Sequence, residues 1–422
     1  MIVTKCKTHT FLSYLFMAYA VIALVINRYN PVQNMLCGIA VLIYMLITLF
    51  EIKNHYNLWF MTFLMFFFNY SIIVNDYLPG GQAIALTYYG DPFYYGIGIH
   101  LMLLFVTVFF TNLLPKIKDY DAICMRKNAK NNSILVVGII ALMLLIIVFG
   151  ISREVGNGYN VQVTALYEYL YLLAFMALYY SDGNIKTEIF IVGIILVAIV
   201  QDLMLGGRIT SLQLIVLLII YYEEWLSKKL LLLGCTAGLM LFNIIGIYRH
   251  SHSWASINVS SIIASTLENR FALDTAYFAW YASITNVVTT LTSSLQERLH
   301  NLLGFVLSIL GVDLEGYVLL PTLSHLKGNM NYGGSLIFTY AYFWLGIIGV
   351  IILAFVMAKV MAWGVKNGKS VIGLFVVTIL CVTLPRWYLY SPLNFFRSLL
   401  LGGICFGVFY IADRIVRYRP LV

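Results

Sequence analysis

Residues 249–334 read RHSHSWASINVSSIIASTLENRFALDTAYFAWYASITNVVTTLTSSLQERLHNLLGFVLSILGVDLEGYVLLPTLSHLKGNMNYGG, the only long stretch of the chain that a lipid bilayer would not accommodate. Nine apolar runs precede this stretch and three follow it. Charged side chains and irregular backbone are costly where they face lipid. We therefore expect residues 249–334 to form one large loop outside the bilayer and to carry the chemistry of the chain.

The composition is that of an integral membrane protein. Apolar residues make up 61% of the 422 residues, charged residues only 10%, and the mean hydropathy is +0.89. These values exclude an ordinary soluble globule. The apolar runs have the length that a membrane-spanning helix needs, so we predict an all-α polytopic membrane protein with about 12 transmembrane helices. The twelve runs are 8–26, 33–50, 57–75, 94–114, 133–151, 162–180, 187–204, 209–224, 230–248, 335–361, 370–387 and 394–412.

We expect one integral membrane domain over 1–422, with the loop 249–334 between the ninth and tenth transmembrane helices. Two segments inside this loop favour helices. Residues 271–291 are too polar for a lipid-exposed span, because they include Asp274 and four threonines, and they predict a helix that is packed in the loop or re-entrant. Residues 295–310 begin charged and end apolar, which is typical of a helix at the membrane surface.

The distribution of positive charge predicts which side of the membrane each segment faces. Twelve spans place both termini on one side. If that side is cytoplasmic, 17 of the 26 Lys and Arg residues lie inside and nine lie outside. An excess of Lys and Arg in cytoplasmic loops is the rule for membrane proteins. We therefore expect cytoplasmic termini and an extracytoplasmic loop. Because topology explains the net charge of +8, we expect no nucleic-acid partner.

The basic residues on the two sides also differ in type. The inner side holds 13 Lys and four Arg, whereas the outer side holds one Lys and eight Arg. Topology requires only positive charge. Phosphate recognition favours arginine, because its planar fork donates two parallel hydrogen bonds and stays charged in a poorly hydrated site. The alternative is that single arginines pair with outer carboxylates such as Glu154 or Glu297, or contact lipid headgroups.

Four of the eight arginines lie at the expected outer ends of spans. Arg208 ends a Gly-Gly-Arg turn, where the glycines let the backbone approach a ligand closely. Arg249 opens the large loop, Arg386 follows Pro385, and Arg397 lies in the first turns of the twelfth span. An arginine at this depth can simply extend to the membrane surface. Arg397 is the most costly of the four in lipid, so we expect it to face an interior cavity.

The histidines offer a proton acceptor. His325 lies in the turn-rich segment before the tenth span, where a histidine can take a proton from a substrate hydroxyl. Its alternative role is that of a hydrogen-bonding loop residue. His250 and His252 could bind a metal ion, but the carboxylate partners expected for a divalent cation are not arranged near them. We predict no metal and no cofactor.

The 31 tyrosines include clusters at 88–89, 94–95, 167–171 and 340–342. Tyrosine is enriched at membrane–water interfaces, where its ring is apolar and its hydroxyl is hydrated. We expect most of these tyrosines to form an interfacial aromatic belt.

Together these features resemble the O-antigen or oligosaccharide repeat-unit polymerases and the related O-antigen ligases. The resemblance rests on twelve spans, Gly-Gly-Arg in a short outer turn, and an arginine that opens a large late outer loop. It also rests on residues 331–334 (NYGG), which lead into a span with Gly346 and Gly349. The ligases carry a His-Asn pair, whereas Leu326 follows His325 here, which counts against a ligase.

The resemblance implies a glycosyltransferase of the bacterial cytoplasmic (inner) membrane that polymerises undecaprenyl-diphosphate-linked oligosaccharide repeat units on its outer face, as in lipopolysaccharide biosynthesis. The implied partners are this lipid-linked oligosaccharide, membrane lipids and a chain-length regulator protein. Preorganised arginines would stabilise the charge that develops on the diphosphate leaving group. The expected catalytic residues are Arg208, Arg249 and His325, and the expected substrate-binding residues are Arg270, Arg386, Arg397 and Tyr332.

Two other classes of protein stay open. An O-antigen ligase would transfer the finished glycan to a different acceptor. A flippase or other transporter of lipid-linked oligosaccharides would favour internal repeats and charged residues near the membrane midplane. The sequence has no evident repeat, and eight of its arginines lie in the outer segments rather than near the midplane.

Overall fold

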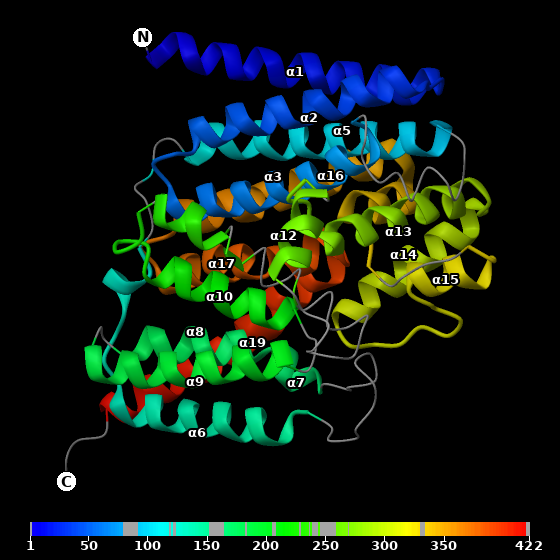
Figure 1. The fold of residues 1–422 in the computed structure, drawn as a ribbon. Coiled ribbons are helices and arrows are strands. Elements are labelled where there is room, and N and C mark those ends of the chain that lie inside the picture. Colours follow the sequence, from blue (N-terminus) through cyan, green and yellow to red (C-terminus); the bar gives the residue numbers. More distant parts are fainter. Residues whose placement is uncertain are drawn as a thin grey trace. The chain divides into compact units, whose positions relative to one another are not determined.

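All regular secondary structure in the described residues is helical, apart from an isolated bridge between Asn131 and Ser181. The fold comes from a computed structural model (Figure 1). It describes residues 2–78, 92–117, 120, 124–151, 164–181, 184–204, 208–227, 229–235, 237–238, 244, 259–268, 270–329 and 334–418. The predicted all-α class is therefore confirmed.

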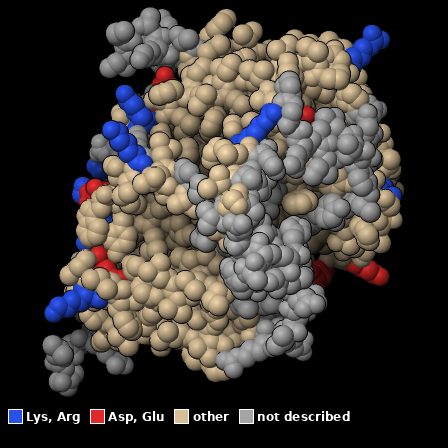
Figure 2. All heavy atoms as spheres, in the orientation of Figure 1, with Lys and Arg blue, Asp and Glu red and all other residues tan. Residues whose placement is uncertain are grey.

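Seven helices in the described part of the chain are long and apolar enough to cross a membrane. They are α1 (Ile2–Ile26), α2 (Pro31–Glu51), α3 (Tyr56–Asp76), α5 (Pro92–Ile117), α9 (Ile185–Met204), α16 (Ile337–Lys366) and α19 (Pro392–Tyr418). In Figure 2, uncharged side chains make up most of the surface drawn for the described residues, with Lys, Arg, Asp and Glu side chains scattered among them.

Four shorter apolar helices coincide with further predicted spans. They are α6 (Ser133–Phe149), α8 (Leu170–Tyr180), α10 (Ile209–Tyr221) and α17 (Val371–Val382). The ninth predicted run, 230–248, lies largely outside the described residues. The number of twelve spans therefore stays a prediction.

The described part of residues 249–334 contains four helices: α12 (Val259–Glu268), α13 (Asp274–Leu291), α14 (Leu295–Ile309) and α15 (Leu320–Leu326). α13 and α14 match the two helices that the sequence predicts at 271–291 and 295–310, whereas α12 and α15 were not predicted. Three short elements complete the described helices: η1 (Arg126–Asn128), α7 (Ala165–Glu168) and α18 (Leu384–Leu389).

The chain, which we expected to form one domain over 1–422, groups into two compact units, each built from segments distant in sequence. Unit 1 comprises Met1–Ala122, Leu267–Gly368 and Arg386–Arg397. Unit 2 comprises Ile123–Thr266, Lys369–Pro385 and Ser398–Val422.

In unit 1, α5 is the central helix. It packs against α1, α2, α13 and α16, and its side chains are almost all buried. A close approach of α13 depends on Gly98, because a Cβ at this position would lie 2.7 Å from the Trp280 ring. The prediction of a helix within residues 271–291 is thus confirmed, and whether it lies in an outer loop or is re-entrant stays a prediction.

α14 is an amphipathic helix of unit 1. Ser294 caps it by accepting a hydrogen bond from the Glu297 amide. One side packs inward, where Trp344 Nε1 donates to Asn301 Oδ1 over 2.9 Å. The opposite side exposes an apolar stripe at helical spacing, made of Leu295, Leu299, Leu303, Val306 and Leu310. Such a helix suits the surface position predicted for residues 295–310.

The predicted tyrosine belt is wrong for several tyrosines. Tyr95, Tyr167, Tyr171 and Tyr340 are buried. Three of their hydroxyls make long-range bonds: Tyr167 donates to the Ala198 carbonyl, Tyr340 donates to the Tyr390 carbonyl, and Tyr171 pairs with the Ser398 hydroxyl. A hydroxyl that finds an internal partner can be buried as readily as placed at an interface. Composition alone does not distinguish the two positions.

α16 is broken near its middle. Gly346 adopts φ +65° and ψ −148°, a conformation that side chains other than glycine rarely tolerate, and Leu345 is also non-helical. The break removes hydrogen bonds from the carbonyls of the preceding turn, so these oxygens need other donors.

Unit 2 contains α6, α8, α9, α10 and α17. Its buried Glu188, in α9, accepts bonds from the Arg126 guanidinium through both carboxylate oxygens and from the Tyr221 hydroxyl over 2.6 Å. The buried Asp202 carboxylate likewise accepts from the amide and hydroxyl of Ser211.

Candidate functional site

Of the seven predicted site residues, Arg249 and Tyr332 lie outside the described residues. Arg208 precedes α10 in unit 2. The other four fold into unit 1: Arg270, His325, Arg386 and Arg397.

Arg397 binds the end of a neighbouring helix. Its Nε and Nη2 groups donate to the carbonyl oxygen of Ser308, over 3.0 and 2.6 Å. Ser308 lies in the last turn of α14, where carbonyls lack intrahelical donors and carry the negative end of the helix dipole. Arg397 is half-buried, and the interior cavity expected beside it stays a prediction.

Arg270 makes a similar contact at the end of α3. Its Nη1 donates to the Val74 carbonyl over 3.3 Å, and its own carbonyl accepts from the Tyr70 hydroxyl. Arg270 has a left-handed φ of 52°. These contacts, which join residues about two hundred positions apart, hold the segment before α13 against α3.

Arg298, which the sequence did not single out, binds the break in α16. Its Nε and Nη2 donate to the carbonyls of Phe343 and Tyr342. These are the oxygens that the non-helical Gly346 leaves without helical donors. Two features of the sequence could have indicated this contact. Arg298 lies on a predicted amphipathic helix, and Gly346 lies inside a long apolar run.

The three guanidinium groups share one kind of partner. Each binds backbone carbonyls at a helix end or break. The alternative that such arginines pair with Glu297 is wrong for Arg298 and Arg397, because the ion pair of Glu297 is with Lys327. For Arg298 and Arg397 no carboxylate lies within ion-pair distance in the described residues.

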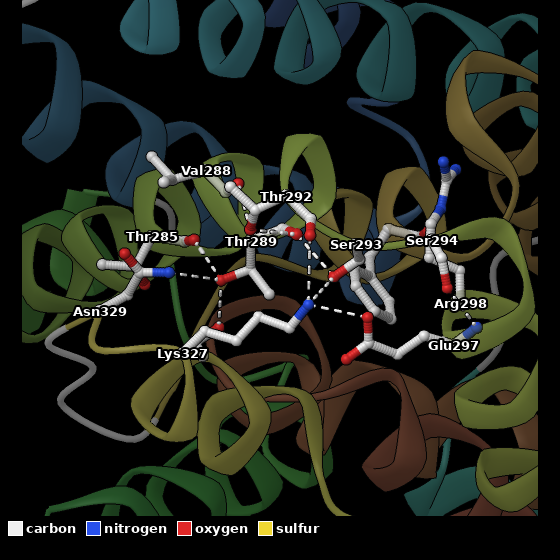
Figure 3. Close-up of polar contacts among 12 residues, drawn as sticks. Thr285, Val288, Thr289, Thr292, Ser293, Ser294, Glu297, Arg298, Lys327 and Asn329 are labelled. Atoms are coloured by element: carbon white, nitrogen blue, oxygen red, sulfur yellow. Dashed lines mark hydrogen bonds and ion pairs between the residues drawn. The ribbon is translucent and has the colours of Figure 1, made fainter.

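His325 lies exposed on α15. Figure 3 shows the polar contacts of the two residues Lys327 and Asn329, which follow α15. Lys327 Nζ, just beyond the helix, donates to Glu297 Oε2 over 2.7 Å and to Ser293 Oγ over 2.8 Å. Asn329 Nδ2 donates to Thr289 Oγ1 over 3.1 Å. These bonds tie the residues around His325 to α13 and α14.

A buried network of neutral polar groups continues this anchoring. Asn286 of α13 donates to Ser335 Oγ over 2.6 Å and accepts from Ser324 Oγ over 3.0 Å. The Leu336 amide donates to Ser283 Oγ. α13, α15 and the start of α16 are therefore joined by side-chain hydrogen bonds as well as by packing. These bonds hold α15, which carries His325, in a fixed position within unit 1.

Asp76 is an unusual ionisable group of unit 1, and no motif in the sequence marks it as a site residue. It is the last residue of α3 and only 4% exposed. Neither carboxylate oxygen has a hydrogen-bond partner in the described residues. The carboxylate lies beside Trp280, whose indole N–H is also unpartnered, and beside Tyr277. A carboxylate at a helix C-terminus is further disfavoured by the dipole.

Arg208 and Arg386 are both half-buried. Arg208 occupies the cap position of α10, as the predicted turn between two spans requires. Arg386 lies in the short helix α18, directly after α17.

In the described part of the chain, no three His, Cys, Asp or Glu side chains gather as metal ligands. His250 and His252 lie outside the described residues.

No protein-family model, no curated protein and no solved structure matches the chain. A functional assignment therefore rests on the chemistry of its own residues.

Proposed function

We propose that the chain is a glycosyltransferase that polymerises undecaprenyl-diphosphate-linked oligosaccharide repeat units. In this reaction an acceptor hydroxyl oxygen bonds to the anomeric carbon of the growing glycan. The bond from that carbon to the diphosphate breaks, and its electron pair leaves with the diphosphate. The chain would cross the bacterial inner membrane about 12 times, with cytoplasmic termini and with the loop 249–334 outside.

The observation that carries this proposal is the state of Arg298 and Arg397. Each uses two of its N–H-bearing groups to bind neutral carbonyl oxygens. A guanidinium has five N–H donors, so donors remain for a ligand. Because no carboxylate neutralises either group in the described residues, both keep a positive charge in a fixed orientation. Preorganised charge of this kind stabilises a diphosphate leaving group.

The acceptor hydroxyl must also lose its proton. His325 is the solvent-exposed candidate for this role. Asp76 is a second candidate, since its carboxylate has no other partner in the described residues. Either group would act as general base, a role worth about 10²- to 10⁴-fold in rate.

A transporter of lipid-linked oligosaccharides is the second candidate function, and Asp76 is the observation that favours it. A buried ionisable residue in a candidate span often marks a proton or substrate pathway. Under this proposal Asp76 would exchange a proton during transport rather than during glycosyl transfer.

The experiment that separates these functions is the length distribution of surface glycan in cells that lack the protein. A polymerase predicts single repeat units on the lipid core. A ligase predicts a core without glycan. A transporter predicts accumulation of the precursor on the cytoplasmic face, and this result would replace the polymerase proposal.

A further inference from the structure

Unit 2 contains a pocket of about 400 Å³ where α6 and α9 begin and α8 ends. This volume lies in the range of about 300–1,000 Å³ that is typical of small-molecule sites. The Asn131–Ser181 bridge lies at the pocket, and the Asn132 amide donates to the Tyr180 carbonyl, so backbone contacts hold this part of its wall together.

The lining of the pocket is divided into two parts. Polar side chains gather where the two helices begin: Asn131, Ser133, Asn184, Lys186 and Thr187. Further along the same helices the lining is apolar: Val136, Val137, Ile140 and Phe190. A pocket that changes from polar to apolar along two apolar helices suits an amphiphile with a polar head and a hydrocarbon chain.

The charge of the residues that line the pocket indicates which kind of lipid headgroup it would bind. Lys186 is the only charged residue among the described lining residues. Its ammonium makes no hydrogen bond or ion pair with any described residue. Two other basic residues of unit 2 differ in this respect: Arg126 is paired with Glu188 and Lys127 with Glu224. An ammonium without a partner among the described residues favours an anionic lipid headgroup.

Hydrogen-bond donors around Lys186 fit the same ligand. Ser133 and Thr187 lie in the first turns of α6 and α9, where backbone amides lack intrahelical acceptors. The Thr187 hydroxyl adds a neutral donor, and the Ser133 hydroxyl lies 3.5 Å from Asn131 Oδ1, to which it donates. A phosphate group accepts bonds from amides, hydroxyls and an ammonium together.

We propose that this pocket binds an anionic glycerophospholipid, with its phosphate beside Lys186 and one acyl chain along Val137, Ile140 and Phe190. This site is independent of the proposed glycosyltransferase reaction. It would hold a lipid where the apolar helices α6 and α9 begin, and it would stabilise unit 2 by ligand binding.

The test is the thermal unfolding of the delipidated full-length protein in detergent, with added phosphatidylglycerol, phosphatidylcholine or inorganic phosphate. Phosphatidylglycerol is expected to raise the unfolding temperature of the wild type in a saturable way. Phosphatidylcholine and inorganic phosphate are expected to have little effect. Equal shifts with phosphatidylcholine would show that binding does not depend on the charge of the lipid headgroup. An equal shift with inorganic phosphate would show a phosphate site without a lipid.

Two variants test the two parts of the lining. Lys186→Ala removes the ammonium and should weaken the apparent affinity for phosphatidylglycerol about tenfold, since a hydrogen bond to a charged group is worth roughly 1.5–3 kcal/mol. Ile140→Trp fills the apolar part and should weaken binding without changing charge. Lys127→Ala, in which the lost lysine pairs with Glu224, is the matched control and should keep wild-type affinity.

Native mass spectrometry of the same proteins gives a second readout, the number of phosphatidylglycerol molecules retained. The wild type and Lys127→Ala should retain one more than Lys186→Ala. If Lys186→Ala and Ile140→Trp both bind phosphatidylglycerol as the wild type does, the pocket is not the lipid site and the proposal is wrong.

Discussion

Glu188 in unit 2 and Asp76 in unit 1 are both buried carboxylates in candidate spans, yet their surroundings differ completely. Glu188 accepts hydrogen bonds from Arg126 and Tyr221. Asp76 accepts none in the described residues. Burial of an ionised group costs several kcal/mol unless a partner offsets it. Glu188 therefore has a structural explanation within the fold, whereas Asp76 lacks one.

The guanidinium groups of the two units differ in the same way. Arg126 binds a carboxylate and is neutralised by it. Arg298 and Arg397 bind carbonyl oxygens and keep their charge. Unit 1 thus holds two guanidinium groups without a carboxylate partner in the described residues, whereas unit 2 pairs Arg126 with Glu188. Unpaired charge in a fixed framework is what a site for a charged substrate requires.

The largest expected effects come from neutralising each buried carboxylate in turn. Glu188→Gln leaves the partly buried Arg126 without its anion and should lower the free energy of unfolding by about 3–5 kcal/mol. Asp76→Asn replaces a buried carboxyl group by a neutral amide of similar shape and should keep or raise the unfolding temperature, while glycan polymerisation falls at least about 100-fold. Thermal unfolding and glycan length in cells measure the two quantities. A strongly destabilised Asp76→Asn protein would show that Asp76 has a partner after all, and the comparison would fail.

The arginines give the next test. Arg397→Lys keeps the charge but loses the two-pronged contact with Ser308, so polymerisation should fall by about 10²- to 10³-fold, as when one donor to a developing anion is removed. Arg126→Lys is the matched control and should lower stability with little change in polymer length. Protein levels must be measured for both variants. Normal polymer from Arg397→Lys would mean that this arginine only caps α14.

A smaller effect is expected at the break in α16. Gly346→Ala places a Cβ on a residue with φ +65°, which should cost about 1–3 kcal/mol of stability. Gly138→Ala in α6, where a Cβ meets no atom within 4 Å, is the control and should be neutral or stabilising. If both variants unfold at the wild-type temperature, the break does not set the position of the carbonyls that Arg298 binds.

The smallest effect concerns Glu223 of unit 2. Burial raises the pKa of the Glu223 carboxyl from its usual 4.5 to about 7, and the Cys124 thiol beside it only partly offsets this. Its contribution to stability is therefore fully present below pH 4.5 and is lost as pH rises through 7. Unfolding temperatures between pH 5 and about 8.5 should fall more steeply for the wild type than for Glu223→Gln. Parallel curves would show that Glu223 ionises normally in the fold.

The sequence predicted elements well where a local pattern sufficed. The apolar runs gave the long helices, and the polar character of residues 271–291 gave the packed helix α13. The amphipathic pattern of residues 295–310 gave α14. In each case the pattern lies within one helix, so no distant contact was needed to interpret it.

The sequence could not supply contacts between distant segments. The partner of Arg397 is the backbone carbonyl of Ser308, 89 positions away. Every residue has a backbone carbonyl, so the amino-acid sequence does not indicate which one an arginine will bind. The buried tyrosines looked like an interfacial belt because their internal acceptors lie on other helices. Asp76 looked like an ordinary residue at the end of a span, since the absence of a partner is visible only in three dimensions.

The most direct test of the proposed function uses the purified protein and lipid-linked oligosaccharide extracted from cells that lack it. Incubation in excess EDTA should yield a ladder of longer lipid-linked glycans with the wild type and almost none with Arg397→Lys, because fixed arginines stabilise the leaving diphosphate. If the wild-type protein leaves every repeat unit unextended both with EDTA and with added divalent cations, the chain is not a polymerase. A ladder that forms only with divalent cations would contradict the role assigned to the arginines.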